Sequence, residues 1–172
     1  MKNTKKLTFS AVLSALAVAV MYVGSMLDVL DMSTAALASI CVMIILTELG
    51  SKYAFMSFAC IGVLSALLVP SKYAAIMFIG FLGFYPMAKR FFEAKFRGPV
   101  CLVLKFVLLN ACTALMVVFS LFVMGASFKE ALWFEILVLV LCNIVFVVYD
   151  YALSQILRTY IFVWRRKLKN KF

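Results

Sequence analysis

Histidine is absent from this sequence of 172 residues, and charged residues of both signs are scarce. Without histidine the chain lacks the commonest general base and metal ligand at neutral pH. This absence excludes Ser-His-Asp triads and HExxH zinc sites. A GxxxxGK[ST] phosphate loop is also missing, so we expect no ATP hydrolysis on this chain. We predict that the protein is not an enzyme and that it holds no metal or cofactor.

Charged residues make up only 14% of the chain, whereas hydrophobic residues make up 67% and the mean hydropathy is +1.13. Soluble domains are about 45–50% apolar and about 25% charged. This composition excludes a water-soluble fold. At about 20 residues per bilayer crossing, the chain has room for six spans and only short connections.

The five cysteines lie inside apolar runs and none forms a CxxC pair. A free cysteine in such a setting packs as a small hydrophobic side chain. We therefore predict free, packed thiols in place of disulfides or a metal site. The cysteines are Cys41, Cys60, Cys101, Cys112 and Cys142.

Apolar runs bounded by charges, glycine or proline predict an all-α fold, an integral membrane six-helix bundle. The connections are too short for a second domain, so residues 1–172 are predicted to form a single transmembrane domain. The predicted helices are 7–27, 33–48, 53–69, 73–92, 99–124 and 132–157, followed by a basic tail, 158–172. Within the fourth helix, Pro86 predicts a kink, because proline lacks a backbone donor.

Lysine and arginine outnumber aspartate and glutamate by 17 to 7, and their distribution favours a membrane surface over nucleic acid. Cytoplasmic loops carry the excess of basic residues. With both termini inside, only Lys72 and Lys129 fall on the outer side, while Lys105 lies near the inner end of the fifth helix. We predict a multi-pass protein of the bacterial cell membrane, with the first helix uncleaved and both termini cytoplasmic.

Polar residues cluster on one face of the sixth predicted helix, where Asn143 and Asp150 lie within about 40° at 100° per residue. The fifth helix contributes Asn110. Polar residues at such depths face a bundle interior or a cavity. For Asn110 and Asn143, ligand contact and an interhelical hydrogen bond both remain open. For Asp150, structural pairing with Lys105 is the preferred interpretation.

At the predicted outer ends of the helices, Lys72, Tyr73, Trp133 and Glu135 combine aromatic rings with charge. An aromatic belt at the membrane surface is the default interpretation. The alternative is a pocket in which a flat ligand stacks on rings and contacts Lys72 or Glu135. Asp28 and Asp31 have a spacing that a metal could use, but a solvated outer loop is preferred.

Small side chains recur in the first predicted helix, with Ala11, Ala15 and Ala19 at every fourth position on one face. Such stripes allow close approach of helix backbones in lipid. The spacing predicts a docking face, either within the chain or against a partner.

Three segments of the chain resemble segments of one transporter family. They are Lys6-Leu7-Thr8-Phe9-Ser10-Ala11, which runs into this stripe, then Leu64 with Leu68-Val69-Pro70, and Gly83-Phe84-Tyr85-Pro86. The pattern is similar to a substrate-binding subunit (S component) of an energy-coupling factor transporter. The likeness covers nearly the whole chain.

This resemblance implies a binder of a vitamin or related small-molecule micronutrient, working with a transmembrane coupling subunit and an ATPase pair on other chains. It also implies that Ala11, Ala15 and Ala19 meet the coupling subunit. By the same resemblance the substrate-binding residues are Asn110, Asn143, Glu135, Lys72, Tyr73 and Trp133. The competing interpretation is a non-transporting scaffold of the MreD-like cell-shape type, and a membrane enzyme acting on lipid or prenyl phosphate is a weaker third.

Overall fold

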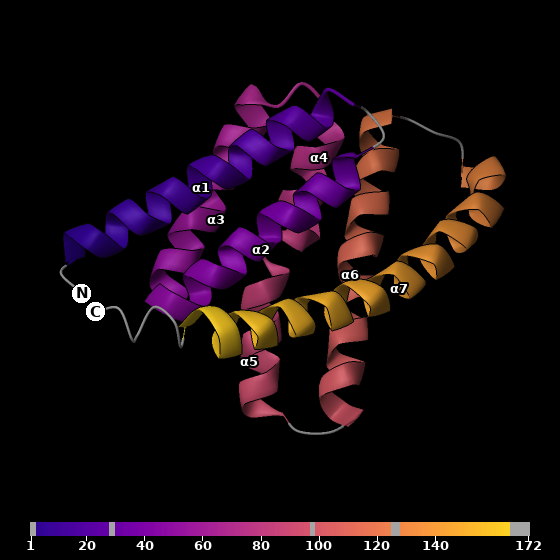
Figure 1. Ribbon diagram of the computed structural model, residues 1–172. Helices are drawn as coiled ribbons and strands as arrows, with labels where there is room; N and C mark the ends of the chain where they lie inside the picture. The colour runs from indigo at the N-terminus through magenta and orange to yellow at the C-terminus, as the bar shows by residue number, and fades with distance from the viewer. Residues whose placement is uncertain (1–2, 28–29, 97–98, 125–127, 166–172) are drawn as a thin grey trace. The chain divides into compact units, whose positions relative to one another are not determined.

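The computed structural model describes the backbone of residues 3–27, 30–96, 99–124 and 128–165, and the side chains of residues 4–27, 30–96, 100–115, 137 and 139–162. All regular structure in these ranges is helical (Figure 1). The elements are α1 (Asn3–Ser25), α2 (Asp31–Leu49), α3 (Ser51–Leu68), α4 (Lys72–Met77), the π-helix η1 (Phe78–Leu82), α5 (Tyr85–Lys95), α6 (Pro99–Met124), α7 (Phe128–Thr159) and the π-helix η2 (Tyr160–Arg165). The prediction of an all-α fold is confirmed.

Five helical segments in the described part of the chain are long and apolar enough to cross a membrane. The described part of α6 adds a shorter apolar stretch, Val100–Leu115. The protein is therefore a membrane-embedded helical protein, while the count of six spans stays a prediction. The five segments are Thr4–Ser25, Asp31–Leu49, Ser51–Leu68, Lys72–Lys95 and Leu139–Phe162.

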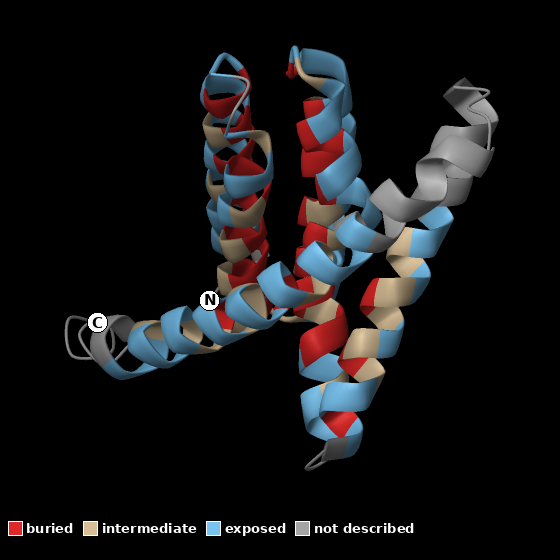
Figure 2. Cartoon of the chain, turned by 90° about the vertical axis from the view of Figure 1, so that its right-hand side faces the viewer, coloured by how far each residue is buried: buried red, intermediate tan, exposed pale blue. Residues whose placement is uncertain are grey.

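The chain forms two compact units, Met1–Cys101 and Leu102–Phe172, and each is described by itself. In the first unit α2 is the central helix, because it contacts α1, α3, α4, η1 and α5. Its fully buried residues include Ala35, Ala38 and Val42. Figure 2 shows buried residues in red along these helices. Small side chains at such contacts allow the close packing on which helix association in lipid depends.

The helices α1 and α2 approach each other closely at Gly24. A Cβ atom added to Gly24 would lie 2.0 Å from Cγ2 of Thr34 in α2. Only a hydrogen atom fits at this point. Glycine therefore sets the distance between the first two helices.

The fourth predicted helix, 73–92, is not a continuous α-helix. The α-helical pattern changes to π at Phe78, and the Gly83 N–H donates to the Phe78 carbonyl, five residues back, at 2.7 Å. A Cβ on Gly83 would lie within 2.8 Å of the Phe58 and Phe78 rings. A regular α-helix resumes at Tyr85 with Pro86 in its first turn, where the missing donor costs least. Glycine and the aromatic packing therefore interrupt the α-helical hydrogen-bond pattern just before Pro86, where the sequence predicts a kink. The kink itself stays a prediction.

The second unit contains α6 from Leu102 onward, α7 and η2. Residues early in α6 meet residues late in α7, so the two helices run antiparallel, and their contact includes an edge-to-face pair of Phe106 and Phe146 at 5.6 Å. Phe146, Leu109 and Leu153 are buried. Most of the described surface of α7 is exposed or half-buried (Figure 2). This unit is a helix pair held by a narrow seam.

The glycine contact generates a first prediction. Gly24→Ala should lower the thermal unfolding midpoint in detergent, because the added methyl group overpacks the α1–α2 contact, at a cost of about 1–3 kcal/mol. Gly62→Ala is the matched control, since its Cβ would lie 3.2 Å from Cγ1 of Ile79, a side-chain atom able to shift. Equal midpoints for the two variants would contradict the prediction.

Candidate functional site

Asn110 of α6 and Asn143 of α7 form a reciprocal amide pair. Asn110 Nδ2 donates to Asn143 Oδ1 at 3.3 Å, and Asn143 Nδ2 donates to Asn110 Oδ1 at 3.1 Å. Each amide also donates to its own helix, Asn110 to the Phe106 carbonyl and Asn143 to the Leu139 carbonyl. All four side-chain N–H donors therefore have acceptors within the protein.

This saturation bears on the two interpretations left open for the pair. A ligand would have to bind the remaining oxygen lone pairs or displace one amide from the other. An amide side chain in a membrane helix has a strong need for a partner, because the surrounding hydrocarbon offers none. The geometry favours an interhelical clamp, and each such hydrogen bond contributes about 0.6 kcal/mol on average.

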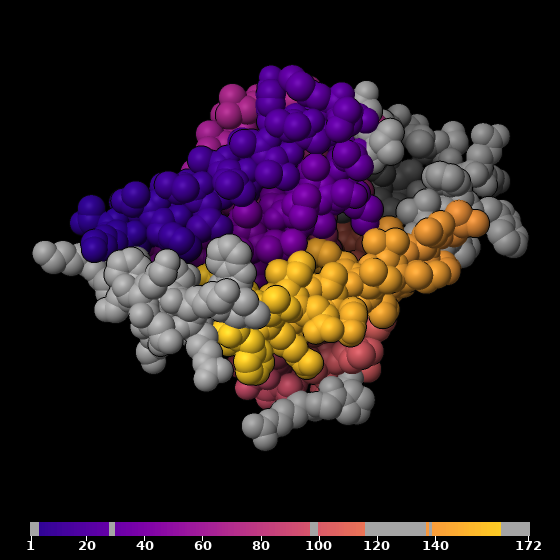
Figure 3. Space-filling model, in the orientation of Figure 1, coloured from indigo at the N-terminus to yellow at the C-terminus, as the bar shows by residue number. Residues whose placement is uncertain are grey.

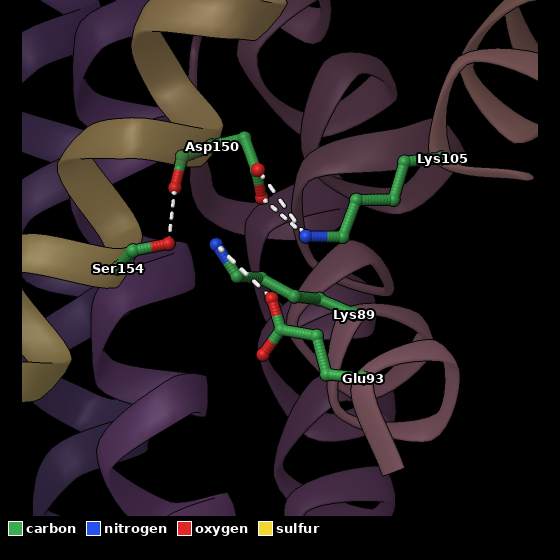
Figure 4. A network of polar contacts seen from close by, with 5 residues as sticks. All are labelled: Lys89, Glu93, Lys105, Asp150 and Ser154. Atoms are coloured by element: carbon green, nitrogen blue, oxygen red, sulfur yellow. Dashed lines mark hydrogen bonds and ion pairs between the residues drawn. The ribbon is translucent and has the colours of Figure 1, made fainter. Parts of the chain in front are cut away.

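About two turns along α7, Asp150 pairs with Lys105 of α6, as predicted (Figure 4). Lys105 Nζ lies 3.2 Å from Oδ2 and 3.3 Å from Oδ1 of Asp150. The Lys105 side chain is 8% exposed, whereas that of Asp150 is 25% exposed. A buried ammonium group is costly unless an opposite charge lies beside it. Burying Lys105 therefore requires the pair, and the predicted pairing of Asp150 with Lys105 is confirmed.

In the first unit, two of the three cations of α5, Lys89 and Arg90, form contacts that the sequence analysis did not predict. Lys89 is 1% exposed and lies 3.9 Å from Glu93, one turn further along (Figure 4). The Arg90 guanidinium donates to the Leu46 carbonyl in the last turn of α2. A cation at a helix C-terminus is stabilised by the helix dipole. The i, i+4 spacing of Lys89 and Glu93 could have indicated their contact. No local sequence pattern indicated the contact of Arg90 with Leu46.

A second polar cluster joins the connections before α2 and before α4. The Ser71 hydroxyl donates to Asp31 Oδ2, and Asp31 Oδ1 is buried without a hydrogen-bond partner among the described residues. Lys72 Nζ donates to the carbonyls of Ala66 and Val69 at 2.8 and 3.2 Å, and so caps the end of α3. Asp31 opens α2 and is half-buried, so its predicted place in a solvated loop is wrong. Asp28 lies outside the described residues.

The remaining predicted substrate residues are not brought together by the structure. Tyr73 follows Lys72 and is 67% exposed, as a ring at the membrane surface would be. Trp133 and Glu135 belong to α7, and their side chains lie outside the described residues. Among the six, the one contact that the structure shows is that between Asn110 and Asn143.

The alanine stripe of α1 does not form the contact with α2 and α3. Ala11, Ala15 and Ala19 are exposed, whereas the buried face of α1 carries Ser10, Ser14, Ala17, Val18 and Met21. At 100° per residue the two faces lie roughly a third of a turn apart. One side of α1 is left uncovered by its neighbours in the first unit (Figure 3). The stripe is therefore available to a partner.

Comparison with protein-family models, curated proteins and solved structures found no match to this chain.

The amide clamp generates a second prediction. Asn110→Leu and Asn143→Leu should each lower the stability of the protein in detergent, because each leaves one amide without its partner. The double variant should lose less than the sum of the two single losses, with a coupling energy of about 0.6–1.7 kcal/mol in a double-mutant cycle. Additive losses would show that the two amides do not stabilise each other.

Proposed function

We propose that this protein is the substrate-binding membrane subunit of an energy-coupling factor type transporter that takes up a vitamin or related micronutrient. The observation that carries the proposal is the exposed stripe of Ala11, Ala15 and Ala19 on α1. A helix face that only contacts lipid can carry bulky side chains equally well, whereas small residues let a partner helix approach the backbone closely. The lack of a phosphate loop in the sequence fits a chain whose ATPases are separate proteins.

The proposal includes six spans in a bacterial cell membrane, with both termini in the cytoplasm. The distribution of lysine and arginine supports this orientation, because it leaves only Lys72 and Lys129 outside. In this orientation the cluster of Asp31, Ser71 and Lys72 lies on the outer side.

The mechanism requires two states of the subunit with different affinities for the substrate. The substrate binds from outside, and the partner ATPases then drive reorientation and release to the inside. Substrate affinity must fall on reorientation, since a ligand that binds both states equally shifts neither. Of the substrate residues proposed from the resemblance, Tyr73 has an exposed ring on which a flat ligand can stack, whereas Lys72 already caps α3. We retain Asn110, Asn143, Glu135 and Trp133 as proposed contacts on the resemblance alone.

One observation favours the alternative, a non-transporting scaffold of the MreD-like type. The amides of Asn110 and Asn143 use their donors on each other and on their own helices. A scaffold needs such a clamp and has no use for a ligand site beside it. A scaffold would also co-purify with cell-wall machinery and not with an ATPase pair.

The small molecule provides the third prediction. Protein purified in mild detergent and then denatured should release one vitamin-like compound in about equimolar amount, identified by mass spectrometry. Tyr73→Ala should reduce that amount through the loss of ring stacking, whereas Tyr22→Ala, which removes another partly exposed ring in the first unit, should not. An empty preparation that is also not stabilised by any compound in a thermal-shift screen of vitamins and precursors would favour the scaffold.

The alanine stripe provides the fourth prediction. Ala15→Phe should abolish co-purification with the coupling subunit and the ATPase pair of the same organism, because the ring would hold the partner helix away. Leu16→Phe is the matched control, because Leu16 is 54% exposed and belongs to a neighbouring face of α1. Both isolated variants should unfold at the wild-type temperature, since both positions are exposed. Retention of the partners by Ala15→Phe would reject the proposed interface.

A further inference from the structure

A groove of about 300 Å³ runs along the seam of the second unit, and the Lys105–Asp150 pair forms part of its lining. All of its lining residues belong to α6 and α7. They are Leu102, Lys105, Phe106, Phe146, Val147, Asp150, Tyr151, Ser154, Gln155 and Arg158. The groove is not used by the function proposed above.

The lining changes character along α7. One end is apolar and is formed by Phe106, Phe146 and Val147. Phe146 is buried and forms the edge-to-face pair with Phe106. The other end is polar and contains Gln155 and Arg158. Residues 146 and 158 are separated by roughly 18 Å along the helix axis at 1.5 Å per residue. An occupant that matches this lining has an apolar tail and a polar head.

The charge of the polar end is positive. Lys105 is balanced by Asp150 at 3.2 Å, so this pair adds little net charge to the groove. Arg158 is exposed, and within the described part of the chain no carboxylate forms an ion pair with it. A guanidinium group binds phosphate oxygens through two parallel hydrogen bonds. The polar end therefore favours an anionic, phosphate-bearing head.

A hydroxyl donor lies two turns before Arg158 along α7 and lines the same groove. Gln155 Nε2 donates to the Tyr151 hydroxyl oxygen at 3.0 Å, and both residues line the groove. This contact occupies an oxygen lone pair of Tyr151 and leaves its O–H proton available as a donor. Tyr151 and Arg158 are seven residues apart in α7, two turns on the same face. Together they offer a neutral and a charged donor to one head group.

We propose that this groove binds one anionic phospholipid, with the phosphate at Arg158 and Tyr151 and an acyl chain against Phe106, Phe146 and Val147. The bilayer supplies this ligand at high local concentration. Basic pockets between membrane helices are a known setting for anionic head groups. A free phosphate ion would leave the apolar end of the groove without an occupant. A whole phospholipid fills both ends, so it matches the lining better than a head group alone.

The experiment measures lipid binding to the full chain in mild detergent by native mass spectrometry. Phosphatidylglycerol is added and compared with phosphatidylcholine of the same acyl chains. The wild-type protein should show one preferential phosphatidylglycerol adduct, and Arg158→Gln should weaken it at least tenfold. Lys52→Gln removes one exposed positive charge outside the groove and should leave the adduct unchanged. If both variants lost the adduct equally, the binding would depend only on the net charge of the protein, and the proposal would be overturned.

The acyl-chain end is tested by a matched pair of neighbouring valines. Val147 lines the groove and Val148 does not, although they are 51% and 64% exposed. Val147→Phe should block the adduct, whereas Val148→Phe should retain it. Both variants place a ring on an exposed surface of α7, so both should fold, which the thermal unfolding midpoint checks. Retention of the adduct by Val147→Phe would overturn the proposal.

A final comparison separates the lipid from its head group. Glycerol phosphate and inorganic phosphate, added at the same concentration as the lipid, should neither form the adduct nor compete with it. Competition by either ion as strong as that by phosphatidylglycerol would show a phosphate site without lipid and would overturn the proposal. None of these readouts depends on transport or on a micronutrient, so they test the groove independently of the proposed function.

Discussion

Polar groups in this chain must find partners within the protein, because the bilayer interior offers no water to hydrogen-bond them. The described part of the second unit follows this constraint at two places along its seam. The donors of Asn110 and Asn143 are satisfied by each other and by carbonyls of their own helices, and Lys105 pairs with Asp150. These contacts define which faces of α6 and α7 meet. They also explain how two helices with largely exposed surfaces keep one register.

The same constraint shapes the first unit through hydroxyl groups that bond to their own helices. Ser10, Ser25 and Ser65 donate to carbonyls three residues back. Once satisfied in this way, a serine packs as a small side chain and lets neighbouring helices approach closely. In α1 the buried face therefore uses serine, whereas the alanines at every fourth position remain exposed. Small residues thus occupy two faces of one helix, one covered inside the unit and one exposed.

The proposed transporter role and the lipid groove concern separate units of the chain. The alanines proposed to meet a partner belong to α1, and the groove belongs to α6 and α7. A subunit that reorients in a membrane has to keep its helices together while its lipid contacts change. Self-satisfied polar pairs meet that need, because they do not depend on water at either surface. A bound anionic lipid would add a contact at the end of α7 that carries Arg158.

The hydrophobic runs of the sequence by themselves determined that the protein is helical and embedded in a membrane, because apolar length and charge spacing are local properties. They also indicated a kink at Pro86, close to the point where the structure has a π-helical interruption, since proline acts on its own backbone. The pairing of Asp150 with Lys105 followed from the need of a buried charge for a partner. Only the tertiary structure decided that Asn110 meets Asn143, that Arg90 caps α2 and that Asp31 is drawn out of solvent to Ser71. It also decided which small-residue face of α1 is covered, because two faces of similar composition differ only in the neighbours that pack on them.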